Sequence, residues 1–407
     1  MTKSIDNIEK ISKFEYLVMF FAICISGNPL FIYTESKMLY VVSAALMFGI
    51  CLFKGRKLSN SKFIFWIVCS IILFLFQNTI LEITSINAEI NFLLRLYIAF
   101  MTASFFGHKF REVYFKVMVF VCLISLPFFI LQASGITFGY RFNRYNTIAI
   151  FNSILPTSFS TGARNSGMFW EPGAFQGFIM LVPLLYCDKL KQLWKMHKKE
   201  CIILLIALLT TKSTTGYITF AAFLFLMILL NGKINIFVKG VLITAIIGAF
   251  SYMWSQDFMG EKIEAEYEEM QSIQKGDVSW NRMGAMMIDI ENISRHPVIG
   301  NGFMDASRYG ILGEYMRGVG NGFTGAINMF GIPFILLYFI SLFGNLSHIP
   351  KASRLVFIFV IILILNGEYM LNYPFFWSLL FIKIPQYGRS INTFNGTQSK
   401  RENITVS

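Results

Sequence analysis

Long apolar runs recur along almost the whole chain, and they constrain its fold more than any other feature of the sequence. Runs of roughly 17 to 22 apolar residues match the helix length that crosses a hydrocarbon core of about 30 Å. Only 14% of the residues are charged and 55% are hydrophobic, whereas about a quarter of the residues of a soluble domain are charged. The sequence therefore predicts an all-α, polytopic integral membrane protein.

The apolar runs predict about twelve transmembrane helices. They are placed at residues 14–33, 38–53, 63–77, 92–107, 113–131, 173–187, 201–211, 216–230, 234–254, 324–346, 355–367 and 369–384. The first run breaks at Gly27, Asn28 and Pro29 and has no small-residue cleavage pattern after it, so we interpret it as a retained span and not as a signal peptide. Twelve spans place both termini on one side of the membrane.

The basic residues indicate which side that is. Most of them fall in short connections on one face: Lys3, Lys10, Lys13, Lys54, Arg56, Lys57, Lys62, Lys109, Arg111, Lys116, Lys189, Lys199, Lys351, Arg354, Lys400 and Arg401. By the positive-inside rule this face, with both termini, is cytoplasmic. We expect one membrane domain over residues 1–387 and a polar, disordered cytoplasmic tail over residues 388–407.

The opposite face carries two long segments, at about residues 132–170 and 255–323. The second is expected to be a large helical extracytoplasmic loop between the ninth and tenth spans, because EKIEAEYEEMQ mixes charges as a solvated helix does. These segments hold arginines that the positive-inside rule does not explain: Arg141, Arg144, Arg164, Arg282, Arg295, Arg308 and Arg317. We attribute them to an anionic ligand.

Other classes of function are disfavoured. The net charge of +12 is spread over short loops and forms no basic stripe with interleaved aromatic residues, so no nucleic-acid partner is expected. The six cysteines lie in or beside apolar runs without a CxxC pair, which indicates packing and neither a disulfide framework nor a zinc site. No Walker-type loop is present, and the absence of a DxD in the outer loops favours chemistry without a metal or other cofactor.

The stretch RNSGMFWEPGAFQ, residues 164–176, lies immediately before an apolar run. Pro172 suits the first position of a helix, and Glu171 suits the positive end of the helix dipole. A helix start at the membrane surface, with Trp170 in the interfacial belt, would explain these residues alone. It leaves Arg164 unexplained, and the planar guanidinium of arginine is well shaped to bind phosphate.

A second stretch, WNRMGAMMIDIENISRHPVIGNG, covers residues 280–302. Met283, Met286, Met287, Ile290 and Ile293 recur at helical spacing, and HPVIGNG is expected to follow as a turn. Arg282, near the start of this helix, is the stronger candidate for a functional residue. His296, alone before a proline, is more often a capping or packing residue than a catalyst.

Together these stretches resemble the bacterial O-antigen polymerases and ligases, which complete surface polysaccharides outside the cytoplasmic membrane. The pattern R-x-x-G-x-F-x-E-P corresponds to Arg164, Gly167, Phe169, Glu171 and Pro172. The pattern of an arginine-led helix ending in H-P-x-x-G-x-G corresponds to Arg282, His296, Pro297, Gly300 and Gly302. A serine-rich break between spans resembles KSTTGY at residues 212–217. The arginine that commonly follows this serine in the family is absent, and Lys212, which precedes Ser213, is the candidate to replace it.

One departure separates the two branches of the family. The ligase branch carries a His-Asn pair about eleven residues before a glycine in the span after the large loop. Counting back from Gly331 reaches Gly320 and Asn321, so the asparagine is present and the histidine is not. This favours a polymerase, and transfer of polymer to the lipid A core by a ligase is the alternative.

The resemblance implies an inverting glycosyltransferase of the bacterial cytoplasmic membrane whose active site faces the periplasm or the cell exterior. A glycan on undecaprenyl diphosphate would be transferred to a hydroxyl of a fresh lipid-linked repeat unit, giving an O-antigen or capsule polymer. Arg164, Arg282 and Lys212 would stabilise the charge that develops on the diphosphate. Glu171 is the first candidate for the general base and His296 the second. A separate chain-length regulator in the membrane is the expected protein partner.

Further substrate-binding candidates are Arg308, Arg317 and Asn321, together with Arg95 inside the fourth span. An arginine inside the membrane is a functional candidate by default, and its partner could be the lipid diphosphate or Glu368, although a structural ion pair is about as plausible. A transporter or flippase remains the rival class, because the interruptions at 28–29 and 331–333 could be broken helices. The two halves show no repeat, and the notable polar residues gather on one face, which suits surface chemistry better. A structural scaffold would explain none of the outer arginines.

Overall fold

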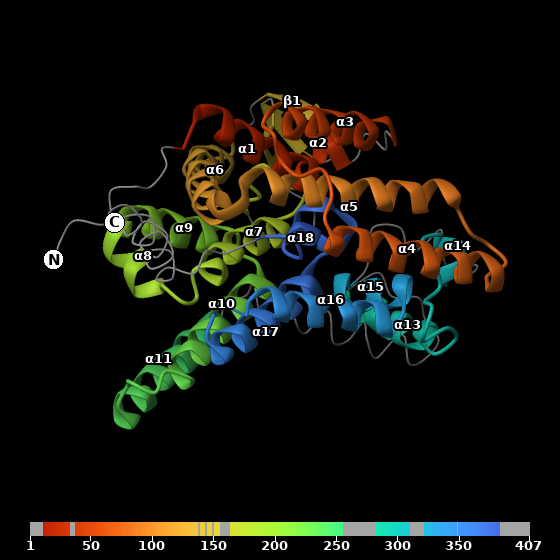
Figure 1. The fold of residues 1–407 in the computed structure, drawn as a ribbon. Helices are drawn as coiled ribbons and strands as arrows, with labels where there is room; N and C mark the ends of the chain where they lie inside the picture. Colours follow the sequence, from red (N-terminus) through yellow and green to blue (C-terminus); the bar gives the residue numbers. More distant parts are fainter. Residues whose placement is uncertain are drawn as a thin grey trace, which may run out of the picture.

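Helices make up most of the described chain, as expected for an all-α protein (Figure 1). The structure is a computed structural model that describes residues 11–32, 37–136, 139–142, 145–148, 150–154, 163–254, 282–309, 321–347 and 349–382. The predicted tail at 388–407 and the charged stretch EKIEAEYEEMQ lie outside the described residues. The one sheet in the described residues is a small antiparallel one of three strands, β1 (Tyr140–Phe142), β2 (Tyr145–Ile148) and β3 (Phe151–Ile154).

The first half of the chain forms α1 (Lys13–Gly27), α2 (Pro29–Ile32), α3 (Lys37–Phe53), α4 (Ser61–Ile80), α5 (Ile86–Phe106), η1 (Gly107–Lys109) and α6 (Phe110–Ala133). The middle forms α7 (Pro172–Leu185), α8 (Leu190–Met196), α9 (Lys198–Thr210), α10 (Thr214–Leu229) and α11 (Ile236–Trp254). The last part forms α13 (Arg282–Ile293), α14 (Asp305–Tyr309), α15 (Gly322–Phe330), α16 (Ile332–Asn345), α17 (Lys351–Gly367), η3 (Met370–Asn372) and α18 (Pro374–Ser378).

The described helices include stretches suited to a membrane. Two of them, Ser61–Ile80 and the continuous stretch Ile86–Ala133, are long and apolar enough to cross it, and α15 with α16 becomes a third if the bent pair counts as one span. Large apolar side chains are exposed along the bundle, including Phe53 (91%) and Phe237 (81%), whereas soluble monomers rarely expose large contiguous apolar patches. The structure agrees with a membrane protein, but it does not confirm a count of about twelve spans.

Two predicted helices are interrupted. The predicted helix 14–33 breaks at Asn28, whose backbone is extended between α1 and α2. The predicted helix 324–346 breaks at Gly331, where φ is +82° and the axes of α15 and α16 differ by 116°. Glycine adopts positive φ without the steric cost of a Cβ, so both interruptions occur where the sequence contains glycine beside a proline-containing helix start.

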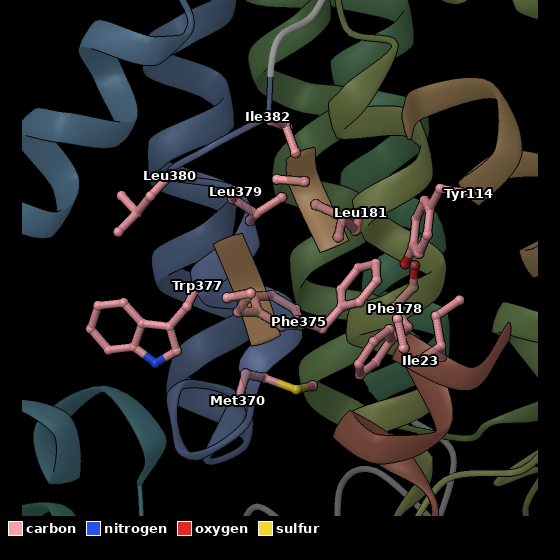
Figure 2. Packing of buried hydrophobic residues seen from close by; sticks show 14 of the residues in the cluster. Ile23, Tyr114, Phe178, Leu181, Met370, Phe375, Trp377, Leu379, Leu380 and Ile382 are labelled. Atoms are coloured by element: carbon pink, nitrogen blue, oxygen red, sulfur yellow. Dashed lines mark hydrogen bonds between the residues drawn. The ribbon is translucent and has the colours of Figure 1, made fainter. Parts of the chain in front are cut away.

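The last predicted helix, 369–384, is wrong. Its described part contains only η3 and the short α18, followed by turns to Ile382. The segment is apolar because it fills the protein interior: Phe375, Trp377 and Leu379 are at most 2% exposed. Figure 2 shows Phe375 beside Phe178, whereas Trp377 points to the opposite side of the segment.

Side chains of α16 satisfy the backbone of this irregular segment. Tyr338 donates to the carbonyl of Phe376 at 3.0 Å, and the Asn345 amide donates to the carbonyls of Leu379 and Ile382, each at 2.9 Å. Non-helical backbone at membrane depth is tolerated only where protein or water satisfies it. Hydrogen bonds from Tyr338 and Asn345 of α16 therefore satisfy backbone carbonyls of this buried C-terminal segment.

Candidate functional site

The first motif forms a buried loop between the break in α1 and the start of α7. The side-chain amide of Asn28 donates to the carbonyls of Ile150 and Met168 at 2.6 and 2.7 Å. The backbone N–H of Trp170 donates to the carbonyl of Gly27 at 3.0 Å. Gly167 has φ of +58°, and a Cβ there would come within 3.0 Å of the Phe175 ring. The motif's glycine is therefore explained by packing as well as by backbone conformation.

The same loop brings Arg164 to the break between α9 and α10. The Arg164 Nε donates to the carbonyl of Thr211 at 3.3 Å. The backbone N–H of Asn165 donates to the carbonyl of Thr210, and its side-chain amide donates to the Thr210 hydroxyl, each at 3.0 Å. Lys212 follows directly and, at φ of +46°, is the only non-glycine residue with positive φ in the described chain. The structure thus joins the Arg164 and Lys212 motifs, which are far apart in sequence.

Glu171 lies at the start of α7, as the sequence predicts. It is the N-cap residue with an extended backbone, and Pro172 follows at the first helical position. Its side chain makes no capping hydrogen bond to α7, and the residue is partly exposed. An acidic group here is favoured by the positive end of the helix dipole.

A second carboxylate, that of Glu368, lies against the same helix start. Glu368 follows α17 as its C-cap and is only 6% exposed. It accepts a hydrogen bond of 3.2 Å from the Trp170 indole, and a Cβ at Gly173 would overlap its carboxylate oxygen. The glycine after Glu171-Pro172 therefore makes room for an acidic group that the sequence places almost two hundred residues away.

Three helix starts pack around this end of α17. A Cβ at Gly322, in the first turn of α15, would overlap the carbonyl oxygen of Glu368. A Cβ at Gly367 would lie 2.7 Å from the Thr215 side chain, in the first turn of α10. With Gly173 of α7, the first turns of α7, α10 and α15 thus each contact Gly367 or Glu368. Ser213 and Asn321 cap the starts of α10 and α15, and the positive ends of the three helix dipoles make this an environment that favours anions.

Asn321 belongs to this convergence. Its side chain caps α15 by accepting from the N–H groups of Phe323 and Thr324 at 3.0 and 3.1 Å, and its amide donates to the Asn366 side chain. Asn321 is 3% exposed. The predicted binding residue is therefore a buried cap that fixes α15 against the end of α17.

The HPVIGNG motif is a turn, as predicted, but it packs against the bend between α15 and α16. The carbonyl of Pro297 accepts from the N–H of Ile332 at 2.8 Å, and Asn301 N–H donates to the carbonyl of Asn328 at 2.6 Å. A Cβ at Gly300 would lie 2.6 Å from the N of Gly331, and one at Gly331 would overlap the carbonyl of Val298. The two glycines permit this backbone contact, so the motif has a structural role.

His296 takes part through its backbone. Its carbonyl accepts from the N–H of Gly300 at 2.8 Å, which closes the turn, while its ring is partly exposed. Among the described residues, the hydrogen bonds of this turn run to the α15–α16 bend and not to Arg164, Glu171 or Lys212. The structure does not bring this second base candidate to the other predicted catalytic residues.

The helix that carries the second motif buries a different face from the predicted one. The described part of α13 runs from Arg282 to Ile293 and is helical, as expected, but Met287 and Ile290 of the predicted apolar stripe are 36% and 51% exposed. The buried face is Ala285, Asp289 and Asn292 instead. The apolar spacing identified the helix correctly and its packed face wrongly, because polar partners on α14 and α15 are available to Asp289. The Arg282 side chain lies outside the described part of the structure.

Arg308 is bound by this polar cluster. Asp289, which is fully buried, accepts from the hydroxyls of Tyr309 and Thr324 at 3.0 and 2.8 Å and from the Asn328 amide at 2.8 Å. The Arg308 guanidinium lies 3.8 Å from Asp289 and donates to the Tyr309 hydroxyl at 2.7 Å. Burial raises the pKa of Asp289 above its ordinary value, against the opposing effects of Arg308 and the three hydrogen bonds. Arg308 is thus held inside the protein by Asp289.

Arg95 does not pair with Glu368. Its guanidinium lies over the Tyr40 ring, 4.7 Å from the centroid, and its buried Nε has no hydrogen-bond partner in the described structure. The described contact of Arg95 is thus with Tyr40, while Glu368 accepts from Trp170, and binding of the lipid diphosphate by Arg95 stays a prediction. A cation–π contact accounts for an arginine among apolar helices. Arg317 lies outside the described residues.

Two acidic residues of the site were not predicted as site residues from the sequence. Glu368 was considered only as a partner of Arg95, although it interrupts an otherwise apolar region and could have been singled out as a membrane carboxylate. Asp289 lies on a helix whose apolar spacing drew attention to the opposite face. Within the described residues, no group of three or more His, Cys, Asp and Glu side chains is arranged to hold a metal ion.

Comparisons with known proteins do not identify the chain. No family model matches it, and no curated protein matches it.

Proposed function

We propose that this chain is an integral membrane glycosyltransferase that polymerises lipid-linked oligosaccharide repeat units into a surface polysaccharide. The observation that carries the proposal is the meeting of two of the sequence motifs, those that begin α7 and α10. Arg164 contacts the backbone immediately before Lys212, and the first turns of α7, α10 and α15 each pack against Gly367 or Glu368. Arg164, Glu171 and Lys212, which resemble residues of the O-antigen polymerase family, thus belong to motifs that lie side by side.

This neighbourhood has the charge that the proposed reaction requires. Breaking the bond between a glycan and undecaprenyl diphosphate develops negative charge on the diphosphate, and fixed donors aimed at that charge lower the barrier. Arg164 and Lys212 would supply two cations, and the starts of α7 and α10 add the positive ends of two helix dipoles. Arg282, at the start of α13, remains the third proposed cation. Arg308 is excluded from this role because Asp289 and Tyr309 hold it in the interior.

We propose Glu171 as the general base that accepts the proton of the attacking hydroxyl. Its carboxylate is partly exposed and does not cap α7, whereas Glu368 is buried against Trp170 and Gly173. Glu368 would therefore act as a positioning residue, because it holds the side chain of Trp170, the residue directly before Glu171. His296 is the weaker candidate, since its backbone closes the turn at the α15–α16 bend.

The setting proposed for this reaction is the outer face of a bacterial cytoplasmic membrane, with about twelve spans and both termini in the cytoplasm. The expected substrates are oligosaccharides on undecaprenyl diphosphate, and a chain-length regulator is the expected partner. Asn321 favours the polymerase branch over a ligase, because no histidine precedes it. The interruptions at Asn28 and at Gly331, the latter a bend of 116°, favour a transporter of polysaccharide precursors, since transporters use broken helices.

A complementation experiment tests the proposal. The gene is deleted in its host and restored as wild type, Arg164→Ala, Lys212→Ala or Glu171→Ala, and the surface polysaccharide is separated on a gel beside a blot of protein level. Arg295→Ala is the matched control, because Arg295 is exposed and follows α13 away from the convergence.

The expected result is loss of the long-chain ladder, with a single repeat unit remaining, in the three site variants but not in Arg295→Ala. Lipid-linked polymer that accumulates without transfer would indicate the ligase. Loss of lipid-linked repeat units from the outer face, measured by accessibility to a membrane-impermeant sugar probe, would indicate the transporter. A normal ladder in the deletion strain would reject all three.

A further inference from the structure

An apolar groove lies between α10, α16 and α17, outside the proposed site. It has a volume of about 600 Å³, which is within the range of roughly 300–1,000 Å³ that is typical of small-molecule pockets. Leu226 and Leu230 line it from α10, Phe339 and Phe343 from α16, and Leu355 from the start of α17. All its lining residues are apolar, so hydrogen bonds cannot be the means by which it holds an occupant. Figure 1 shows α10, α11 and α17 side by side at this end of the bundle.

Basic side chains border one end of the groove. The Arg354 guanidinium lies over the ring of Phe343, 4.7 Å from its centroid, and the buried Arg354 Nε has no hydrogen-bond partner in the described structure. Lys239 of α11 donates to the carbonyl of Leu229, next to the lining residue Leu230, at 2.8 Å. Lys351 is exposed one turn before Leu355. The groove thus combines an apolar channel with a positively charged rim.

The groove is remote from the proposed glycosyl-transfer site. Leu226 lies 12 residues after Thr214, at the other end of α10 from the Arg164 contact, which is about 18 Å at 1.5 Å per helical residue. Arg354 lies 14 residues before Glu368 along α17, which is about 21 Å. A diphosphate held beside Arg164 cannot therefore also reach the cations at this rim. The groove is a separate site for a separate ligand.

The chemistry of the groove selects an anionic lipid. An apolar channel beside lipid-facing side chains such as Leu355 (52% exposed) and Ile340 (58% exposed) accepts an acyl chain by dispersion and area burial. Basic residues between helices at one membrane surface bind anionic lipid head groups. A zwitterionic lipid could place an acyl chain in the channel but would bring no net negative charge to the basic rim. A soluble anion could bind at the rim but would leave the apolar channel unfilled.

We infer that the groove between α10, α16 and α17 is a binding site for an anionic phospholipid, with an acyl chain between Phe339, Phe343 and Leu355 and the phosphate group at Arg354. The site does not depend on the proposed activity. It would hold α16 and α17 together at the end of the bundle opposite to the proposed catalytic residues.

Binding is measured by native mass spectrometry on the full-length protein in detergent, after removal of endogenous lipid. Phosphatidylglycerol and phosphatidylcholine with identical acyl chains are titrated separately, and undecaprenyl phosphate is added as a competitor. The variants are Arg354→Gln, which removes the rim charge, and Ile340→Trp, which fills the groove. Leu336→Trp is the matched control, because Leu336 is 55% exposed on the same helix and does not line the groove.

We expect wild type and Leu336→Trp to bind phosphatidylglycerol at least fivefold more tightly than phosphatidylcholine. Arg354→Gln should lower the affinity for phosphatidylglycerol about fivefold and leave phosphatidylcholine unchanged, and Ile340→Trp should weaken both. Equal affinity for the two lipids in wild type, or unchanged binding in Arg354→Gln, would overturn the inference. Displacement of phosphatidylglycerol by equimolar undecaprenyl phosphate would also overturn it, by assigning the groove to a polyprenyl lipid.

A second measurement avoids any effect of the substitutions on folding. Phosphatidylglycerol that carries a photoreactive group on its acyl chain is irradiated with the wild-type protein, and the labelled peptides are sequenced. Labelling centred on residues 339–343 and 355–359 supports the site, whereas labelling spread evenly over exposed helices such as α3 and α11 contradicts it.

Discussion

The indole N–H of Trp170 donates to the carboxylate of Glu368 across 198 residues of sequence, at a distance of 3.2 Å. This hydrogen bond joins the residue directly before Glu171 to the end of α17. It places an acidic side chain, itself only 6% exposed, at the start of α7. The segment FWEP at residues 169–172 is therefore held in place by a hydrogen bond to Glu368, which lies outside the sequence motifs.

Removing this hydrogen bond should weaken both the fold and the reaction. Trp170→Phe keeps the aromatic contact with Tyr373 but leaves the buried Glu368 carboxylate without the indole donor. Hydrogen bonds to charged groups contribute about 1.5–3 kcal/mol, so we expect a destabilisation of that size and a shorter polysaccharide ladder. Thermal unfolding in detergent measures the stability. Trp194→Phe, at a 48% exposed position, is the control, and equal effects of the two substitutions would refute the role of the hydrogen bond.

Substitutions of Lys212 can distinguish the effect of its charge from the effect of its backbone conformation. A non-glycine residue at positive φ costs about 1–3 kcal/mol, so Lys212→Gly should leave stability unchanged or slightly higher although it removes the ammonium group. If that ammonium stabilises the diphosphate, polymer synthesis should fall by about two orders of magnitude, which is typical for loss of one well-placed donor. Lys212→Arg should retain most activity. Full activity of Lys212→Gly would show that the position matters only for the turn.

The backbone contact between Gly300 and Gly331 at the α15–α16 bend should leave no room for a side chain at either position. Gly331→Ala and Gly300→Ala each place a Cβ against backbone atoms at positive φ, and we expect each to destabilise the protein by more than about 3 kcal/mol or to prevent its accumulation. Gly344→Ala in α16, where nothing lies within 4 Å, should instead be neutral or stabilising by up to about 1 kcal/mol. Protein level and melting temperature distinguish these outcomes, and similar behaviour of all three variants would argue against the packed bend.

Asp289 should be the dominant partner of Arg308. Asp289→Ala removes three hydrogen bonds and leaves a buried guanidinium without its carboxylate, which costs about 3–5 kcal/mol. Asp305→Ala removes a carboxylate 3.9 Å from the same guanidinium, but that side chain is 44% exposed, so the cost should be below about 1 kcal/mol. Melting temperatures of the two variants in detergent give the comparison. The opposite order would assign Arg308 to Asp305.

The raised pKa of Asp289 also predicts the pH dependence of stability. Because the folded state binds the proton more tightly than the unfolded state, the stabilising contribution of protonation is fully present below the unfolded-state pKa of about 3.9. It is lost as the pH rises through the folded pKa. Asp289→Asn cannot titrate, so the difference in stability between wild type and this variant should shift in favour of the variant as the pH rises from about 4. A difference that is constant with pH, measured by unfolding in detergent, would contradict the raised pKa.

Helix positions followed well from the sequence where local signals are strong. The start of α7 at Glu171-Pro172 and the helix over residues 282–293 were both predicted, because a proline at the first helical position and an apolar period are local features. The helix predicted at 63–77 extends to Ser61–Ile80, since Asn60 provides a cap that hydropathy does not register. The helix predicted at 369–384 failed because hydropathy does not distinguish a lipid-facing helix from a buried irregular segment.

The arrangement of the site was less predictable. The sequence identified Arg164 and Lys212 separately, but their meeting depends on the backbone contacts of Asn165 with Thr210. The burial of Asp289 depends on donors from α14 and α15 that no local pattern connects. Long-range polar contacts of this kind leave no periodicity in the sequence, and they determine which predicted arginines face a ligand and which are held in the interior.

The bend at Gly331 has a consequence for the order in which the chain assembles. The Gln77 amide of α4 donates to the carbonyls of both Ile299 and Met329, at 2.6 and 2.9 Å, so the corner needs a helix synthesised about 250 residues earlier. Because α4 and the 297–302 turn both precede residues 322–345 in the chain, the partners of this corner are already synthesised when α15 and α16 emerge from the ribosome. The corner is therefore a contact between early and late segments that can form only in the last part of synthesis.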